Sequence, residues 1–177
     1  KTKPDQFSYG SVGAGTPGHL SAVALGLGAK INMVHIPYKG VGPLLTDLMA
    51  GRLQAFFSSA SAAMPHIKGG KLKALAVTTP KRMNSLPQVP TVAESGLPGF
   101  SYTLWGGLFA PAGTPPDVIA KLNAAAKQAA QSLEFRQRLE SEGLAVSTGT
   151  PQELEAYVKR EEARWRKIVK ENNIKPD

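Results

Sequence analysis

The chain has 177 residues, of which 42% are hydrophobic, so it can bury one core or two small lobes and is not a mostly disordered protein. Its apolar runs are far shorter than the roughly 20 residues of a transmembrane helix, and the lack of cysteine argues against disulfides, thiolate chemistry and sulfur-bound metals. The net charge of +8 lies almost wholly in residues 1–116, where ten Lys or Arg stand against three acids and favour an anionic partner.

Strand-like runs alternate with helix-length segments in the first hundred residues, which is typical of an α/β fold. The predicted strands are residues 7–11, 32–37, 54–58, 72–78 and 102–109. Small or one-sided apolar patterns predict two crossover helices, at residues 17–27 and 43–50. These elements together predict a sheet with helices packed against it.

The pattern changes to longer helices in the last third of the chain. The predicted helices are residues 115–131, 133–142 and 151–171. The preceding stretch, residues 99–116, is rich in Gly and Pro and is the best candidate for a boundary or a crossing between lobes. A surface loop inside a single domain explains its composition equally well.

Three of the predicted helices begin with the same Thr-Pro step, at Thr16, Thr114 and Thr150. Thr is favoured as the N-cap and Pro at the first helical position. In the second and third of these helices an acid follows at the third position, Asp117 and Glu153. We therefore predict reciprocal caps there, with each carboxylate opposing the positive end of its helix.

The first Thr-Pro helix lacks such an acid, because His19 occupies the third position. No Asp or Glu occurs between Asp5 and Asp47. A helix start left open after a Gly-rich turn is a ready anion site. The alternative is that its N–H groups simply face water.

The same turn matches the dinucleotide fingerprint G-x-G-x-x-G through Gly13, Gly15 and Gly18. The match is incomplete, because no acid follows the second predicted strand to bind a ribose hydroxyl. Lys39 would still accept a 2'-phosphate, so a nicotinamide-dependent oxidoreductase remains the alternative function. The P-loop pattern fails, because no Gly-Lys-Ser/Thr follows the glycines.

Other chemistries find little support in the sequence. His19, His35 and His66 lack metal-ligand spacing and acidic company, so we interpret them as packing or capping residues and predict no metal. Ser11 is out of register for a nucleophile elbow, and no Asp and His pair accompanies it. The lysines near residue 70 have no interleaved aromatic side chains, which argues against nucleic-acid binding.

Several motifs in register resemble those of the Bug (TctC-like) extracytoplasmic solute receptors of the tripartite tricarboxylate transporter family. They are YGSVGAG at 9–15, HIPYKG at 35–40, GKLKALAV at 70–77, LPQVPT at 86–91, WGGL at 105–108 and APAGTP at 110–115. The resemblance covers nearly the whole chain in the family's order. It implies a type II periplasmic-binding-protein fold, with two three-layer αβα lobes and the ligand in the cleft between them.

The resemblance also implies how the chain divides. Residues 1–101 would form the second, ligand-binding lobe, and residues 102–177 the crossing strand and the C-terminal helical part of the first lobe. One lobe would thus be complete, and the other would be represented by its helices, since the family's N-terminal segment lies upstream of Lys1. We expect any signal peptide to lie upstream as well.

The resemblance implies a ligand site in three turns. The glycine turn would hold a ligand carboxylate through backbone N–H and hydroxyl groups. The turn after the second strand would line the adjacent wall, and two serines after the third strand would complete it. In chain order the implied ligand-binding residues are Ser11, Gly13, Ala14, Gly15, Thr16, His19, Tyr38, Lys39, Gly40, Ser58 and Ser59. Tyr38 as a core residue, Lys39 as a surface charge and Trp105 as a packing residue remain the alternatives.

The implied function is that of a periplasmic binding protein without catalytic activity or cofactor. It would capture a small carboxylate (a dicarboxylate, an amino acid or an aromatic acid) and deliver it to the permease subunits of a membrane transporter. The C-terminal helices carry apolar stripes that lack a partner in this chain. We therefore expect self-association or a companion N-terminal fragment.

Overall fold

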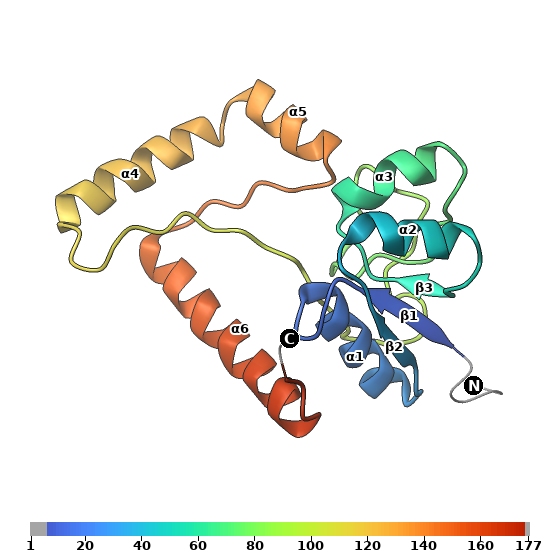
Figure 1. The fold of residues 1–177 in the computed structure, drawn as a ribbon. Coiled ribbons are helices and arrows are strands. Elements are labelled where there is room, and N and C mark those ends of the chain that lie inside the picture. The colour runs from blue at the N-terminus through green and yellow to red at the C-terminus, as the bar shows by residue number, and fades with distance from the viewer. Residues whose placement is uncertain (1–6, 176–177) are drawn as a thin grey trace. The chain divides into compact units, whose positions relative to one another are not determined.

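The computed structural model describes residues 7–175, coloured along the chain in Figure 1. It has two compact units, one of Lys1–Leu104 with Ile168–Asp177 and one of Trp105–Lys167. The first unit contains the strands and the first three helices: β1 (Ser8–Ser11), α1 (Pro17–Ala29), β2 (Val34–Pro37), α2 (Val41–Met49), β3 (Ala55–Phe56) and α3 (Ala60–Lys68). The remaining helices are α4 (Pro116–Ala129), α5 (Leu133–Ser141) and α6 (Pro151–Glu171), whose last residues belong to the first unit.

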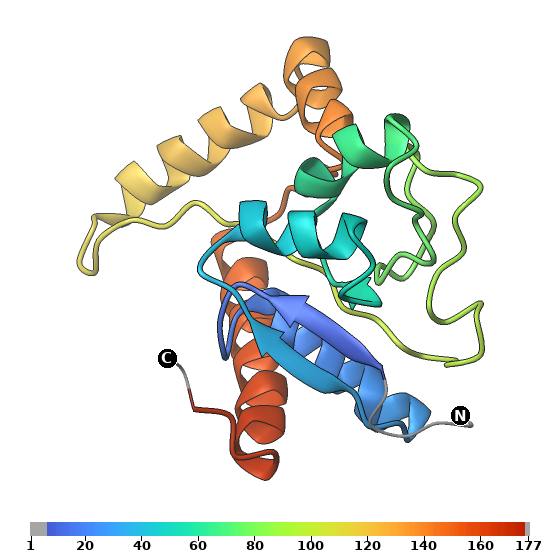
Figure 2. The ribbon, with the colours of Figure 1, turned by 45° about the vertical axis from the view of Figure 1, so that its right-hand side comes forward.

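The strands form a parallel sheet with the order β2-β1-β3. Successive side chains of a strand face opposite sides of the sheet. On one face of β1, Tyr9 stacks near His19 of α1; on the other, a side chain at Gly10 would meet Leu44 of α2 at 2.9 Å. The helices α1 and α2 therefore cover opposite faces, and Figure 2 shows α1 behind β1 and β2. This layered α/β arrangement confirms the predicted fold class.

The core of the first unit lies on both sides of this sheet and beneath α3. Leu44 is fully buried against Gly10, where only glycine leaves room for it. A second cluster joins α3 to the following loops through Met64, Val77, Leu86 and Val89. Each such side chain contributes about 1.5 to 3 kcal/mol when fully buried, so these contacts hold α3 against the loops that follow it.

Two predicted strands are not formed in the described chain. Residues 72–78 contribute only a single parallel bridge, between Val77 and Thr91, and residues 102–109 have no regular secondary structure. The N–H of Tyr102 donates to the carbonyl oxygen of Thr78 (2.8 Å), but no ladder follows. A strand needs a hydrogen-bonded neighbour along its length, so an apolar run alone does not define one.

The helix α3 was not predicted. Pro65 lies inside it, and proline normally indicates a helix end because it lacks the N–H that an interior residue donates. The helix persists because Met64 is buried in the core below it.

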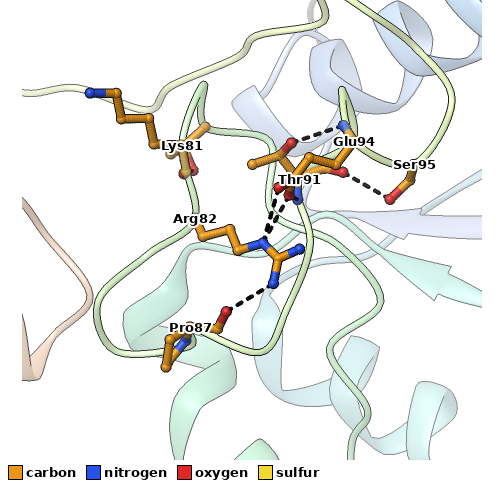
Figure 3. A network of polar contacts seen from close by, with 7 residues as sticks. Lys81, Arg82, Pro87, Thr91, Glu94 and Ser95 are labelled. Atoms are coloured by element: carbon orange, nitrogen blue, oxygen red, sulfur yellow. Dashed lines mark hydrogen bonds and ion pairs between the residues drawn. The ribbon is translucent and has the colours of Figure 1, made fainter.

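A network of hydrogen bonds stabilises the loop that follows Val77, between Arg82 and Ser95 (Figure 3). The carboxylate of Glu94 accepts from the N–H of Thr91 (2.7 Å), while the N–H of Glu94 donates to the Thr91 hydroxyl (3.0 Å). Arg82 donates to Glu94 (3.0 Å) and to the carbonyl oxygen of Pro87 (3.2 Å). The bond from the Thr91 N–H and then the one from Arg82 lower the pKa of Glu94 below its ordinary value.

Replacing Glu94 by Gln is expected to destabilise the protein modestly at neutral pH, since the amide keeps an acceptor but loses the charge that faces Arg82. A carboxyl whose pKa is lowered by folding adds stability above its unfolded pKa and loses that stability as pH falls through the folded value. Urea unfolding should therefore show a difference between wild type and variant at pH 7 that shrinks below about pH 4. Lys81→Gln is the control, because that side chain points away from the network (Figure 3). An undiminished difference at low pH would contradict the assignment.

The second unit is held by few buried contacts. Trp105 meets the Tyr157 ring edge-on at 5.2 Å, and Asn123 donates to the carbonyl oxygen of Gly149 (3.0 Å). At the start of α6, the carboxylate of Glu153 accepts from the N–H of Thr150 (2.7 Å), which confirms the predicted capping box.

The predicted cap at Thr114 is wrong, because α4 begins one residue later, with Pro115 as its N-cap. The Thr114 hydroxyl donates instead to the carbonyl oxygen of Pro111 (2.8 Å). A sequence that places two prolines together, Pro115 and Pro116, allows either to be the first helical residue.

Many large apolar side chains of the second unit are exposed. They are Trp105, Leu108, Phe109, Val118, Leu122, Leu133, Phe135 and Leu144. Leu108, Leu133 and Phe109 are the most exposed, at 71%, 70% and 65%. No helix among residues 7–175 is both long enough and apolar enough to span a membrane.

Candidate functional site

Three loop-to-helix turns share one edge of the sheet. Because β1, β2 and β3 are parallel, the turns that follow them all leave from their carboxyl ends, the edge at which open α/β sheets bind ligands. The N–H of Tyr38, just beyond β2, donates to the carbonyl oxygen of Ser11 at the end of β1 (2.8 Å). A Cβ on Gly18 of α1 would lie 2.7 Å from the carbonyl oxygen of Phe57, just beyond β3. All three turns are therefore close together.

The turn between β1 and α1 is built by short polar contacts. The fully buried Ser11 hydroxyl donates to the carbonyl oxygen of Gly13 (2.9 Å) and accepts from the N–H of the same residue (3.2 Å). The Thr16 hydroxyl donates to that carbonyl oxygen as well (2.7 Å). Gly13 and Gly15 have φ of 131° and 75°, which disfavour any other residue.

The three helices at this edge all start without an acid. Their N-caps are Thr16, Gly40 and Ser59, none of which makes a side-chain cap hydrogen bond within the described chain. By contrast, α4, α5 and α6 each carry an acid in the first turn: Asp117, Glu134 and Glu153. The sequence predicted the first of these open helix starts and an acid-free first turn in the helix after Gly40, whereas the start of α3 was not predicted; the parallel sheet brings all three to one edge. Helix N-termini carry partial positive charge, so this edge favours anions.

Two histidines meet beside the glycine turn. The Nδ1 atom of the buried His19 accepts from the N–H of Gly15 (3.0 Å), which confirms its predicted capping role. Its ring stacks on that of His35, with centroids 4.0 Å apart and planes 9° apart. Burial raises the pKa of the adjacent Tyr9 to about 12, so that this ring is an uncharged phenol.

Their spacing in the sequence suggested that the three histidines lie far apart, which is wrong for His19 and His35. His66 lies apart, on α3. Among the residues that the structure describes, no cluster of three or more His, Cys, Asp or Glu is arranged to hold a metal ion.

Beside the second turn lies an acid whose charge is paired, Asp47 near the end of α2. Asp47 accepts from Arg52 (2.7 Å) and from the Tyr38 hydroxyl (2.9 Å), and these bonds, with Arg52 first, lower the pKa of its carboxyl. Burial and the Asp47 bond raise the pKa of Tyr38. Its hydroxyl is thus already engaged as a donor, whereas Lys39 is exposed and Gly40 has a φ of 129°.

The third turn follows β3. The Ser58 hydroxyl donates to the carbonyl oxygen of Ser59 (2.9 Å), and the Ser59 hydroxyl lies 3.3 Å from that of Ser61. These hydroxyls remain able to accept further hydrogen bonds.

Comparison with known proteins gives the family. Residues 1–174 match the family model described as "Tripartite tricarboxylate transporter family receptor" (TctC). The chain belongs to this receptor family. It is 34% identical to the protein BugT of Bordetella pertussis over 177 residues, covering 99% of this chain and 54% of BugT. It is 37% identical to a protein encoded in the tcbD-tcbE intergenic region of Pseudomonas sp. strain P51, covering 98% of this chain and 52% of the relative. The chain thus spans about half the length of these relatives.

Solved structures of the TctC family share the fold. A Rhodopseudomonas palustris protein, Rpa4515 with adipate, is 34% identical with a TM-score of 0.83, covering 97% of this chain and 57% of its own. MatC of the same species, with bound malate, is 34% identical with a TM-score of 0.77, covering 93% and 57%. The periplasmic binding protein BugD is 32% identical with a TM-score of 0.79, covering 98% and 58%.

The eleven residues expected to bind ligand all lie in the three turns at the carboxyl edge or at the start of α1. Trp105 lies in the second unit, against Tyr157. His35 was not among the expected site residues, although it contacts Ser11 and His19. Its register with Tyr9 on the neighbouring strand places it there, and register is a long-range property that spacing along the chain does not reveal.

Proposed function

We propose that this chain is the carboxylate-binding part of a periplasmic solute receptor that delivers its ligand to a tripartite tricarboxylate-type transporter. The observation that carries the proposal is the group of three acid-free helix starts at one sheet edge. The ligand would be held at the helix starts among the eleven expected residues, by binding and without catalysis. The N–H groups of Gly13, Gly15 and Tyr38 donate within the turns and would shape the site rather than contact the ligand. Permease subunits of the transporter would be the protein partners.

The electrostatics of the edge support an anionic ligand. Asp47 is the one acid between Asp5 and Glu94 in the sequence. Arg52 offsets its charge, and the Tyr38 hydroxyl donates a hydrogen bond to it. A carboxylate arriving at the glycine turn therefore meets helix dipoles and Lys39 rather than a free acid. Charge-assisted hydrogen bonds to backbone N–H groups are about twice as strong as neutral ones.

The family relatives support the class of ligand. Two of the solved relatives hold adipate and malate, which are both dicarboxylates. The acid-free helix starts at the sheet edge of this chain would favour a ligand of that charge.

A thermal-shift screen tests the proposal. A ligand at 100 times its Kd stabilises the protein by about 2.7 kcal/mol, so adipate, malate, amino acids and aromatic acids should raise the melting temperature. Nicotinamide dinucleotides, the ligands of the alternative oxidoreductase function, should not. Stabilisation by dinucleotides with no response to any carboxylate would reverse the proposal.

The exposed apolar side chains of the second unit predict self-association of the 177-residue chain. Burying each large side chain contributes about 1.5 to 3 kcal/mol, so a second copy can cover Leu108 and Phe109. Light scattering should show a mass above that of the monomer, and L108S with F109S should lower it. Leu75→Ser, at a 64% exposed position in the first unit, is the control. A wild-type protein that is monomeric at all concentrations would contradict this expectation.

A further inference from the structure

His35 connects the two side chains that shape the glycine turn. From β2, its Nε2 atom lies 2.6 Å from the Ser11 hydroxyl, and its ring covers that of His19 at 4.0 Å. Ser11 is bonded to Gly13, and His19 is bonded to Gly15. The His35 imidazole, on a neighbouring strand, therefore contacts both side chains that are hydrogen-bonded to the glycines of the turn.

Counting donors assigns the direction of these hydrogen bonds. The Gly13 carbonyl oxygen only accepts, so the single proton of the Ser11 hydroxyl points to it. The third contact of that hydroxyl is then a hydrogen bond only if Nε2 of His35 donates. In the same way, Nδ1 of His19 accepts from the N–H of Gly15 and carries no proton. The two rings thus act differently, one as a donor to the turn and one as an acceptor from it.

We infer that His35 is a positioning residue for the carboxylate site, a role that rests on the proposed function. By donating to the Ser11 hydroxyl, His35 fixes the direction of that hydroxyl, which in turn orients Gly13. Through the stacked ring it fixes His19, whose Nδ1 holds the N–H of Gly15 in a defined direction. His35 itself need not touch the ligand, because its contribution is to keep the turn in one conformation before the ligand arrives.

Three variants separate the two contacts. His35→Gln keeps an N–H donor for Ser11 and loses the stacked ring, whereas His35→Phe keeps a ring for His19 and loses the donor. His35→Ala loses both. Loss of a hydrogen bond of this kind changes an equilibrium by up to about tenfold. We expect His35→Ala to weaken adipate or malate binding by about tenfold in NMR titrations, with intermediate losses for the other two variants.

The matched control is His66→Ala, which removes an imidazole from α3 and should leave the affinity unchanged. A purely structural role for His35 would lower the melting temperature of all three variants and leave carboxylate affinity as in the wild type. That result would overturn the inference.

The ligand-free protein gives an independent readout. The amide resonance of Gly15 and the ring nitrogens of His19 should shift in His35→Ala and should shift less in His35→Phe, which keeps the stacked ring. If the wild type binds no carboxylate, the proposed function fails, and these resonances still decide whether His35 positions the turn. Unchanged resonances in His35→Ala would overturn the inference regardless of ligand binding.

Discussion

Replacing Thr16 by Asp is expected to weaken carboxylate binding by about 100-fold or more while the fold persists. Thr16 is the N-cap of α1, and an aspartate there would put a carboxylate where the ligand's is expected to lie. Two like charges about 4 Å apart repel by about 4 kcal/mol at an effective dielectric constant of 20. This repulsion is larger than the free-energy change that corresponds to a tenfold to 100-fold loss of affinity.

The helix itself should tolerate this change. Aspartate is as good an N-cap as threonine or better, and its charge opposes the helix dipole favourably. The bond from the Thr16 hydroxyl to the Gly13 carbonyl oxygen is lost, which offsets part of that gain. The melting temperature should therefore change little.

Thr16→Asn is the matched control, because it caps the helix without a charge. Calorimetric titration with adipate and malate should show nearly normal affinity for Thr16→Asn and a large loss for Thr16→Asp. Equal affinities in the two variants would show that the start of α1 is not the anion site.

Replacing Leu44 by Ala is expected to destabilise the protein by about 3 kcal/mol, within the range for large-to-small changes in a core. Leu44 is completely buried between α2 and the sheet, and its side chain fills the space above Gly10. Gly10 has no side chain that could move into the resulting cavity, which Leu53 also borders.

Urea unfolding of the wild type and the variant measures this difference. Leu75→Ala serves as the control, since Leu75 is 64% exposed and its truncation should change stability by less than about 0.5 kcal/mol. A loss below about 1 kcal/mol for Leu44→Ala would mean that α2 does not pack on the sheet as described.

Sequence patterns predicted helices and strands well where the element depends on residues close together in the chain. The helix α6 lies at its predicted bounds, and its cap at Thr150 and Glu153 formed as expected, because both depend on residues within one turn. The helix α3 was not predicted; Pro65 lies inside it, and the helix packs into the core through the buried Met64. The division of the chain at residues 101 and 102 stays a prediction.

The candidate site divides in the same way. Glycines at positive φ and a helix start without an acid are readable from the sequence, because they are set by neighbouring residues. The hydrogen bond from the Tyr38 hydroxyl to Asp47 was not readable, because Tyr38 precedes α2 and Asp47 lies near its end, so their contact depends on how the turn is placed beside the helix. Whether the site residues contact a ligand remains a proposal.

The sequence by itself determined the alternation of strands and helices, the open start of α1 and the resemblance to a receptor family. Only the tertiary structure decided that β1 lies between β2 and β3, with Tyr9 in register with His35. That register stacks His35 on His19 and brings the other two acid-free helix starts to the same edge. The physical reason is that strand pairing joins residues far apart in the chain, so its outcome depends on burial across the whole unit rather than on local preference.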